Sequence, residues 1–308
     1  MLVFFTYLYA PTVLGLEVNP AKSVLISTAH DEPAITLEIF QEVFSRPAAI
    51  GYLTESERRL VQGRFAERPL IEEVIGVGVD VPQPQTYPRI APPRDEDAGS
   101  EGAQSRDIEA RLEEIQPQSP AHLQDRGVVF RRRHRLPGPL LLYGGRIDPG
   151  KGCEELLQYF SEYIKDGGSA TLALMGVKLM TIPEEPFLRF AGLLSEAERL
   201  QALEAANVVA CPSPYESLSL LALESFAAGT PILANARSAV LVEHCTRSNA
   251  GLYYADRDEF VACLDLLIRD DALRDALGRN GREYIRRHYQ WDVVLEKYER
   301  LFRKVSAA

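Results

Sequence analysis

A glycine-rich turn with two cations has residue types suited to phosphate binding. The segment GRIDPGKG, from Gly145 to Gly152, lies between the apolar run LLLY and a helix-like segment. It nearly matches the pattern G-x-x-x-x-G-K-[ST], but Gly152 stands where a magnesium-binding loop needs a hydroxyl. This mismatch disfavours an ATPase. Arg146 and Lys151, beyond a strand end and beside a helix start, still suit a diphosphate. The alternative is a tight turn with exposed charges.

Two glutamates form a second group. Glu216 lies in a turn, PSPYE, and Glu224 lies in the helix that follows. Eight residues of helix span about 12 Å at 1.5 Å per residue. The two carboxylates are therefore spaced to hold opposite ends of one elongated ligand. Two solvated glutamates, one near a helix start and one in its middle, are the alternative interpretation.

These residues resemble the signature of a known family. The spacing Glu216-x7-Glu224, followed by a G-T-P strand start, is similar to the E-x7-E motif of the retaining glycosyltransferases of family 4, which have the GT-B fold. The segments GRIDPGKG and FAGLLSEAERLQALEAANVVACPS follow the family's order. The resemblance covers most of residues 140–300. It departs from many relatives after Glu216, where Ser217-Leu218-Ser219 replaces Gly-Phe-Gly.

The resemblance implies transfer of a sugar from a nucleotide diphosphate sugar, of UDP or GDP type, with retention of configuration and without a metal or other cofactor. Glu216 would bind sugar hydroxyls and Glu224 ribose hydroxyls. Arg146 and Lys151 are assigned to the departing diphosphate, where negative charge builds up. The other expected donor contacts are turn or backbone positions: Gly145, Gly176, Leu193, Ser219, Leu220 and Leu221.

One histidine has a suggestive position. His30 ends a predicted strand, and Pro33 opens the helix-like segment after it. The family carries a histidine at such a strand end, facing the donor sugar, so the resemblance makes His30 a sugar contact. From the residues alone, a structural role remains open. No role is predicted for the remaining histidines, which are His122, His134, His244 and His288.

Apolar runs that alternate with helix-like segments predict parallel sheets in two α/β domains. Residues 1–81 are interpreted as a partial, Rossmann-like acceptor-side domain, and 127–287 as a doubly wound, Rossmann-like donor domain. Prolines and charges in 82–126 predict a disordered linker or insertion. The last segment, 288–308, is predicted to be a helix that packs back toward the first domain.

Composition narrows the class of protein. The formal net charge of −10 disfavours nucleic acid as a partner. No apolar stretch approaches the roughly 20 residues that span a bilayer, and the apolar opening, 1–16, lacks the basic start of a signal peptide. We expect that opening to form a buried strand and loop. Four cysteines without metal-ligand spacing predict thiols in the cytoplasm.

Alternatives to a complete transferase also follow from the sequence. Nothing like the glycine-rich start of a GT-B acceptor domain precedes His30. We therefore expect an incomplete acceptor domain and little transfer to a carbohydrate or lipid-linked acceptor unless a second copy or a complementing chain covers the first strand. A non-catalytic nucleotide-sugar-binding subunit is one alternative. A sugar phosphorylase or a nucleotide-sugar epimerase on a similar fold is another.

Overall fold

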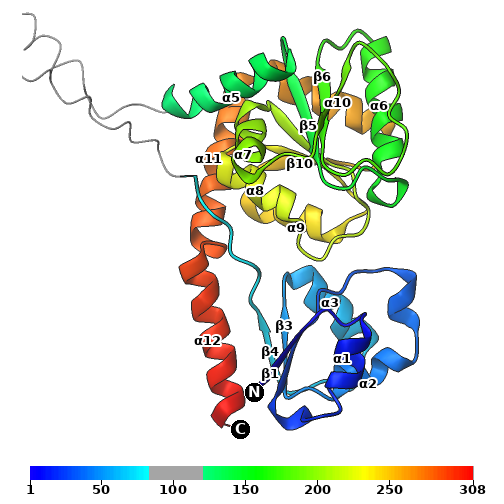
Figure 1. The fold of residues 1–308 in the computed structure, drawn as a ribbon, viewed down its shortest axis with the longest axis vertical. Helices are drawn as coiled ribbons and strands as arrows, with labels where there is room; N and C mark the ends of the chain where they lie inside the picture. Colours follow the sequence, from blue (N-terminus) through cyan, green and yellow to red (C-terminus); the bar gives the residue numbers. More distant parts are fainter. Residues whose placement is uncertain (83–120, 308) are drawn as a thin grey trace, which may run out of the picture.

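The computed structural model describes residues 1–82 and 121–307. Two α/β domains, each built on a parallel sheet, are stacked along the long axis of the molecule (Figure 1). The chain enters the second domain through α5 and returns to the first through its last helix. The predicted class of two Rossmann-like domains is confirmed in this arrangement.

The first domain holds a sheet in the order β1-β2-β3-β4, with every neighbouring pair parallel. Residues on one face of this sheet pack against the helices between the strands. In chain order, its elements are β1 (Leu2–Phe5), α1 (Ala10–Gly15), η1 (Pro20–Lys22), β2 (Ser23–Ile26), η2 (Pro33–Thr36), α2 (Ile39–Ser45), β3 (Ala49–Tyr52), α3 (Glu55–Arg64) and β4 (Ile71–Val74).

The prediction of a buried strand and loop at the start of the chain is wrong. Among the residues that the structure describes, strand β1 lies at the edge of the sheet and pairs with β2 alone. Phe5 is 58% exposed, and Leu2 and Val3 are also exposed. The following segment is the short helix α1, with Pro11 in its first turn, where a missing N–H costs nothing. An apolar run predicts a strand but does not say whether both of its sides are paired.

The second domain holds a six-stranded parallel sheet in the order β10-β9-β8-β5-β6-β7. In chain order, its elements are α5 (Ala121–His134), β5 (Leu140–Gly144), η3 (Pro149–Lys151), α6 (Cys153–Lys165), β6 (Thr171–Met175), β7 (Leu188–Gly192), α7 (Glu196–Ala205), β8 (Val208–Cys211), α8 (Leu220–Ala228), β9 (Ile232–Asn235), α9 (Ala239–Ser248), β10 (Gly251–Tyr254), α10 (Arg257–Arg269) and α11 (Asp271–His288).

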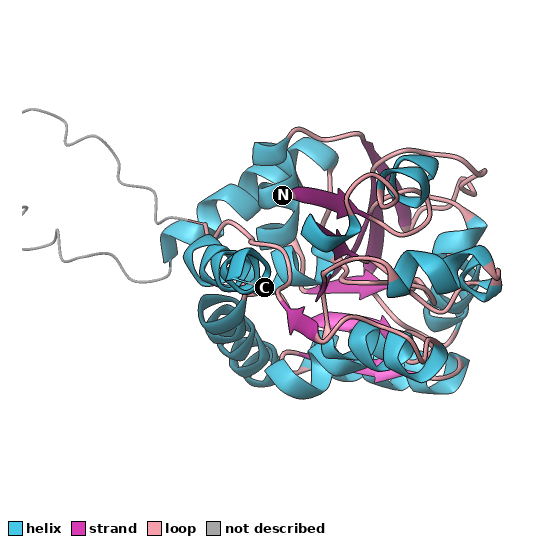
Figure 2. Cartoon of the chain, turned by 90° about the horizontal axis from the view of Figure 1, so that it is seen from below, coloured by secondary structure: helices cyan, strands magenta, loops and turns pink. Residues whose placement is uncertain are grey.

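Helices surround the strands of the molecule (Figure 2). In the second domain, separate buried clusters lie on opposite faces of the sheet, so its strands are enclosed on both faces. This burial explains the continuous apolar runs such as LLLY and VVAC. Helix α9 and strand β10 were not predicted, because a short helix with a mixed surface and a four-residue strand have weak periodicity.

The predicted linker boundary at residue 126 lies inside a helix. Helix α5 begins at Ala121, and it packs closely on α7. Gly127 makes this approach tolerable, since a Cβ there would lie 2.9 Å from the Cα of Ala205. Burial against α7 thus extends the second domain further toward the N-terminus than composition indicates. The rest of the predicted linker, 83–120, lies outside the described residues.

The last helix, α12 (Trp291–Ala307), leaves the second domain and runs along the first, shown in red in Figure 1. It contacts β4 and β3. Lys304 Nζ lies 3.1 Å from the Glu73 carboxylate, and Arg300 pairs with the same group. Within 1–82 and 121–307, no helix combines the length and apolar character that crossing a bilayer requires.

The strand order locates the crevice of the second domain. Strands β5 and β8 are neighbours, and the chain leaves them toward opposite edges of the sheet. Ligands of doubly wound sheets bind beyond the carboxyl ends of the strands at such a switch point. The turn that contains Lys151 follows β5, and the turn that contains Glu216 follows β8. Both predicted groups therefore meet at one place.

Candidate active site

Close backbone contacts shape the turn after β5. Gly152 has φ +74°, and a Cβ on it would lie 2.3 Å from the carbonyl oxygen of Pro212, in the turn after β8. Gly176 has φ +124°, and a Cβ there would lie 2.0 Å from the carbonyl oxygen of Gly145. A larger residue at either position would push the turns apart. Gly152, which breaks the P-loop pattern, thus allows the turns after β5 and β8 to approach each other closely.

The two predicted charge groups are joined by an ion pair. Lys151 Nζ donates to Glu216 Oε1 at 2.8 Å across 65 residues of sequence. The backbone of Lys151 is fixed as well, because Asp148 Oδ1 accepts from its N–H at 3.0 Å. The Arg146 side chain is 63% exposed, with Nε 3.7 Å from Asp148 Oδ2. One cation is therefore held against a carboxylate and the other extends toward solvent.

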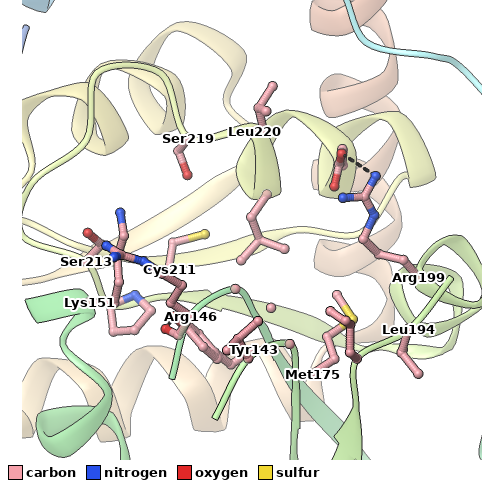
Figure 3. A pocket seen from close by; sticks show the side chains of 18 of the residues that line it. Tyr143, Arg146, Lys151, Met175, Leu194, Arg199, Cys211, Ser213, Ser219 and Leu220 are labelled. Atoms are coloured by element: carbon pink, nitrogen blue, oxygen red, sulfur yellow. Dashed lines mark hydrogen bonds and ion pairs between the residues drawn. The ribbon is translucent and has the colours of Figure 1, made fainter. Parts of the chain in front are cut away.

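A cavity of about 570 Å³ extends from this ion pair along the carboxyl edge of the sheet. Arg146 and Lys151 lie toward one end of it and Arg199 toward the other (Figure 3). Apart from His30, every predicted site residue lines this cavity. These residues are Gly145, Arg146, Lys151, Gly176, Leu193, Glu216, Ser219, Leu220, Leu221 and Glu224.

The start of α8 faces the cavity. The helix begins at Leu220, because Ser219 adopts a left-handed conformation with φ +63°. The first amides of a helix have no acceptor inside it and carry the positive end of its dipole. The amides of Leu220 and Leu221 are therefore suited to an anion, although Ser219 does not cap them with its side chain.

A buried histidine supports this turn. His244 Nε2 lies 2.7 Å from the Leu218 carbonyl oxygen, and its Nδ1 lies 3.2 Å from the Tyr284 hydroxyl. Burial lowers the pKa of His244, which favours the neutral ring. We found no signal for this residue in the sequence, since a lone histidine in a helix indicates nothing about its distant partners.

The far end of the cavity has its own ion pair. Glu224 Oε1 lies 3.0 Å from Arg199 Nη2, drawn as a dashed line in Figure 3. Burial raises the pKa of Glu224, while the charge of Arg199 opposes that rise. Arg199 is a second residue that sequence reasoning missed, because a charged position on α7 reads as a solvated helix face.

His30 lies outside the cavity, in an adjoining cleft of about 390 Å³ between the domains. Glu216 lines both spaces, and the ring of His30 lies 6.5 Å from that of Tyr215. His30 Nε2 is 3.4 Å from Glu32 Oε2. The structure therefore places His30 on the opposite wall from the turn that carries Glu216. Among the described residues, no three His, Cys, Asp or Glu side chains gather as a metal site would.

Comparison with protein families finds a match. The model of the family described as "Glycosyl transferases group 1" matches residues 129–284, which is about half of the chain and includes both ends of the cavity.

Curated relatives match the same part of the chain. Glycogen synthase from Mycobacterium tuberculosis is 28% identical over 177 residues, covering 54% of this chain and 42% of the relative. A phosphatidyl-myo-inositol mannosyltransferase from Mycobacterium leprae is 28% identical over 186 residues, covering 56% of this chain and 48% of the relative. The chain thus spans less than half the length of either relative.

Solved structures resemble the whole described fold. Sucrose-phosphate synthase from Thermosynechococcus elongatus has a TM-score of 0.69 at 17% identity, covering 99% of this chain and 73% of that one. Anabaena HepE in complex with UDP has a TM-score of 0.71 at 13% identity, covering 100% of this chain and 79% of that one. At such identities the similarity shows the two-domain fold alone.

Proposed function

Because the chain belongs to the group 1 glycosyl transferases, we propose that it moves a hexose from a nucleotide diphosphate sugar to a carbohydrate or lipid-linked acceptor with retention of configuration, as family 4 enzymes do. The donor is of UDP or GDP type. The observation that carries this proposal is the Lys151–Glu216 ion pair, which joins the turns after β5 and β8 at the switch point of the sheet.

The phosphate end of the site supplies charge for the departing group. Transfer breaks the bond between the anomeric carbon and the diphosphate oxygen, whose electron pair stays with the diphosphate. The acceptor hydroxyl oxygen forms the new bond, and its proton leaves to a diphosphate oxygen or to water. Arg146, Lys151 and the amides that start α8 stabilise the growing negative charge, so no metal is required in the proposal.

The donor lies along the cavity in this proposal. Glu216 accepts hydrogen bonds from hydroxyls of the sugar, and Glu224 accepts hydrogen bonds from the ribose hydroxyls at the opposite end. Backbone groups near Gly176 and Leu193 meet the base, and Gly145, Ser219, Leu220 and Leu221 border the diphosphate. Lys151 pairs with Glu216, and the diphosphate of the donor competes with Glu216 for this cation.

The acceptor enters from the cleft between the domains. His30 contacts the sugar from the wall opposite Glu216, and Tyr215 borders the same space. An acceptor in this cleft approaches the sugar at Glu216, away from the end of the donor cavity that holds Glu224.

Release of the nucleoside diphosphate tests the function. Purified chain is incubated with UDP- and GDP-sugars and a panel of acceptors, with and without inorganic phosphate and with EDTA. We expect release of UDP or GDP that needs no phosphate and survives EDTA, and an α-linked product from an α-linked donor by NMR. Binding without release contradicts transfer and supports a binding subunit. Phosphate-dependent release supports a phosphorylase, and isomerised donor supports an epimerase.

Two further proposals concern the cellular location of the protein and its dependence on a partner chain. All four cysteines are free thiols, which fits the reducing cytoplasm. The dependence of transfer on a second copy or a complementing chain stays a prediction, and light scattering during the assay tests it. Robust turnover by a monodisperse monomer would contradict that dependence.

A further inference from the structure

The first turn of α3 connects the two domains. The Glu243 carboxylate, on α9 of the second domain, accepts from the N–H of Ser56 at 2.6 Å and from the N–H of Glu55 at 3.3 Å. The Ser56 hydroxyl donates to the Ala239 carbonyl at 3.2 Å. A side chain of one domain therefore caps a helix of the other, at the end where the helix dipole favours a negative charge.

Glu243 is enclosed at this contact. Its side chain is 5% exposed, and Arg247 Nη1 donates at 2.9 Å to Oε1, the oxygen that also accepts from the N–H of Glu55. Although burial raises it, hydrogen bonds from Ser56 and Arg247 hold the pKa of Glu243 below its ordinary value. The carboxylate is therefore charged when it meets the start of α3.

The same turn contacts the loop of the donor site. Thr54 Oγ1 accepts from the N–H of Glu57 at 3.1 Å, which caps α3, and donates to the Ser217 carbonyl at 3.3 Å. Ser217 directly follows Glu216. One hydroxyl thus joins the start of α3 to the loop that carries the sugar-binding carboxylate.

A second buried acidic side chain joins the turn to the segment that leads to His30. Glu57, which is 1% exposed, accepts from the N–H of Ala29 at 2.6 Å, from the N–H of Leu53 at 2.5 Å and from the Ser27 hydroxyl. These donors lie at the carboxyl ends of β2 and β3, and Ala29 immediately precedes His30. Glu57 therefore ties the backbone of the histidine turn to α3.

We propose that the first turn of α3 sets the position of His30 relative to Glu216, with Glu57 and Glu243 as positioning residues for the transfer reaction. Glu243 and Thr54 hold the turn to the donor domain, and Glu57 holds it to the histidine. The inference rests on the proposed function, because it assigns these contacts to the alignment of two groups in that reaction. Neither carboxylate lines the donor cavity.

Kinetics of Glu243→Gln, Glu57→Gln and Thr54→Val test the proposal. Misplacement of a reacting group by about 1 Å costs up to roughly 100-fold in rate. We expect kcat to fall about 10- to 100-fold while KM for the donor and calorimetric Kd for UDP or GDP stay within about twofold, because the donor cavity is intact. Thr54→Ser should restore kcat. The control is Glu283→Gln, which removes an exposed ion pair of α11 in the same domain.

Hydrogen exchange gives a readout that needs no activity. We expect Glu243→Gln to speed exchange at residues 54–57 and 215–219, and Glu57→Gln to speed it at 27–31. Glu243→Ala is the second variant if glutamine preserves the contact. Faster exchange with unchanged kcat would overturn the proposal. Wild-type chain that binds UDP or GDP without turnover would refute the proposed function instead. In that case, unchanged exchange at 215–219 in Glu243→Ala would separately overturn the positioning role.

Discussion

The two domains present their charged groups to the central cleft in different ways. In the second domain, Lys151, Glu216 and Glu224 reach the cavity directly with their side chains. In the first, His30 lines the adjoining cleft instead of the cavity, and the carboxyl group of Glu57 is buried against backbone amides. The second domain thus exposes charged side chains in its cavity, whereas the first buries a carboxyl group against the backbone that leads to His30.

This difference separates two kinds of mutational effect. Removing a side chain that touches the ligand changes binding or transition-state stabilisation, whereas removing one that holds the backbone changes alignment and stability. The following measurements sharpen the comparison, beginning with the largest expected effect.

Lys151→Ala tests the phosphate end of the second domain. The change removes one cation and leaves the partly buried Glu216 without its partner. Loss of one preorganised group for a developing negative charge costs about 100- to 1,000-fold in rate. We expect kcat to fall by that factor and Kd for UDP or GDP to rise about 10-fold or more, measured by product release and calorimetry. Lys165→Ala, at the end of α6, is the control. Unaltered kcat would show that Lys151 has no role in leaving-group stabilisation.

Glu57→Gln tests the first domain through the pH dependence of stability. Burial raises the pKa of Glu57 to about 7 from 4.5, against hydrogen bonds from Ser27, Leu53 and Ala29. Below pH 7, the folded wild type therefore favours the protonated form of Glu57. The stability that this raised pKa contributes is fully present below pH 4.5 and is lost as the pH rises through 7. The glutamine has no proton to lose.

Urea unfolding at pH 4.5 to 8 measures this effect. The free energy of unfolding of wild type should fall by on the order of 2–3 kcal/mol relative to Glu57→Gln over that range, and the two curves should run parallel above it. Glu42→Gln, which changes an exposed glutamate of α2 and keeps Glu57, should follow the pH dependence of the wild type. A constant difference between wild type and Glu57→Gln at every pH would contradict the raised pKa.

The two glutamates of the cavity should differ by a smaller factor. Glu224→Ala should weaken binding of free nucleotide and of nucleotide sugar alike, by about 10-fold, because both carry the ribose. Glu216→Ala should weaken chiefly the nucleotide sugar and leave free nucleotide within about twofold. Calorimetry with UDP, GDP and their sugars makes the comparison. Equal losses of free nucleotide in the two variants would refute the division of roles.

Many of the residues that line the cavity of the second domain could be predicted because their signals are local. Each signal lies within a short segment of the sequence. These signals are glycines with positive φ, a lysine beside a helix start and two glutamates at a fixed spacing. The alternation of apolar runs and helices likewise predicted parallel sheets, since strands buried on both faces must be apolar. Helix α9 and strand β10 were not predicted because their local periodicity is weak. The edge position of β1 was not predicted either, because strand pairing depends on segments that are far apart in the sequence.

By itself, the sequence determined many of the residues that come to line the cavity, because glycine conformation, helix starts and residue spacing act over a few positions. Only the tertiary structure decided which of them meet. The Lys151–Glu216 pair forms because the strand order makes β5 and β8 neighbours. Arg199 on Glu224, His244 beneath Leu218 and Glu243 on the start of α3 depend on helix packing between segments far apart in the chain. No spacing in the sequence predicts these contacts, because they depend on how the folded domains pack.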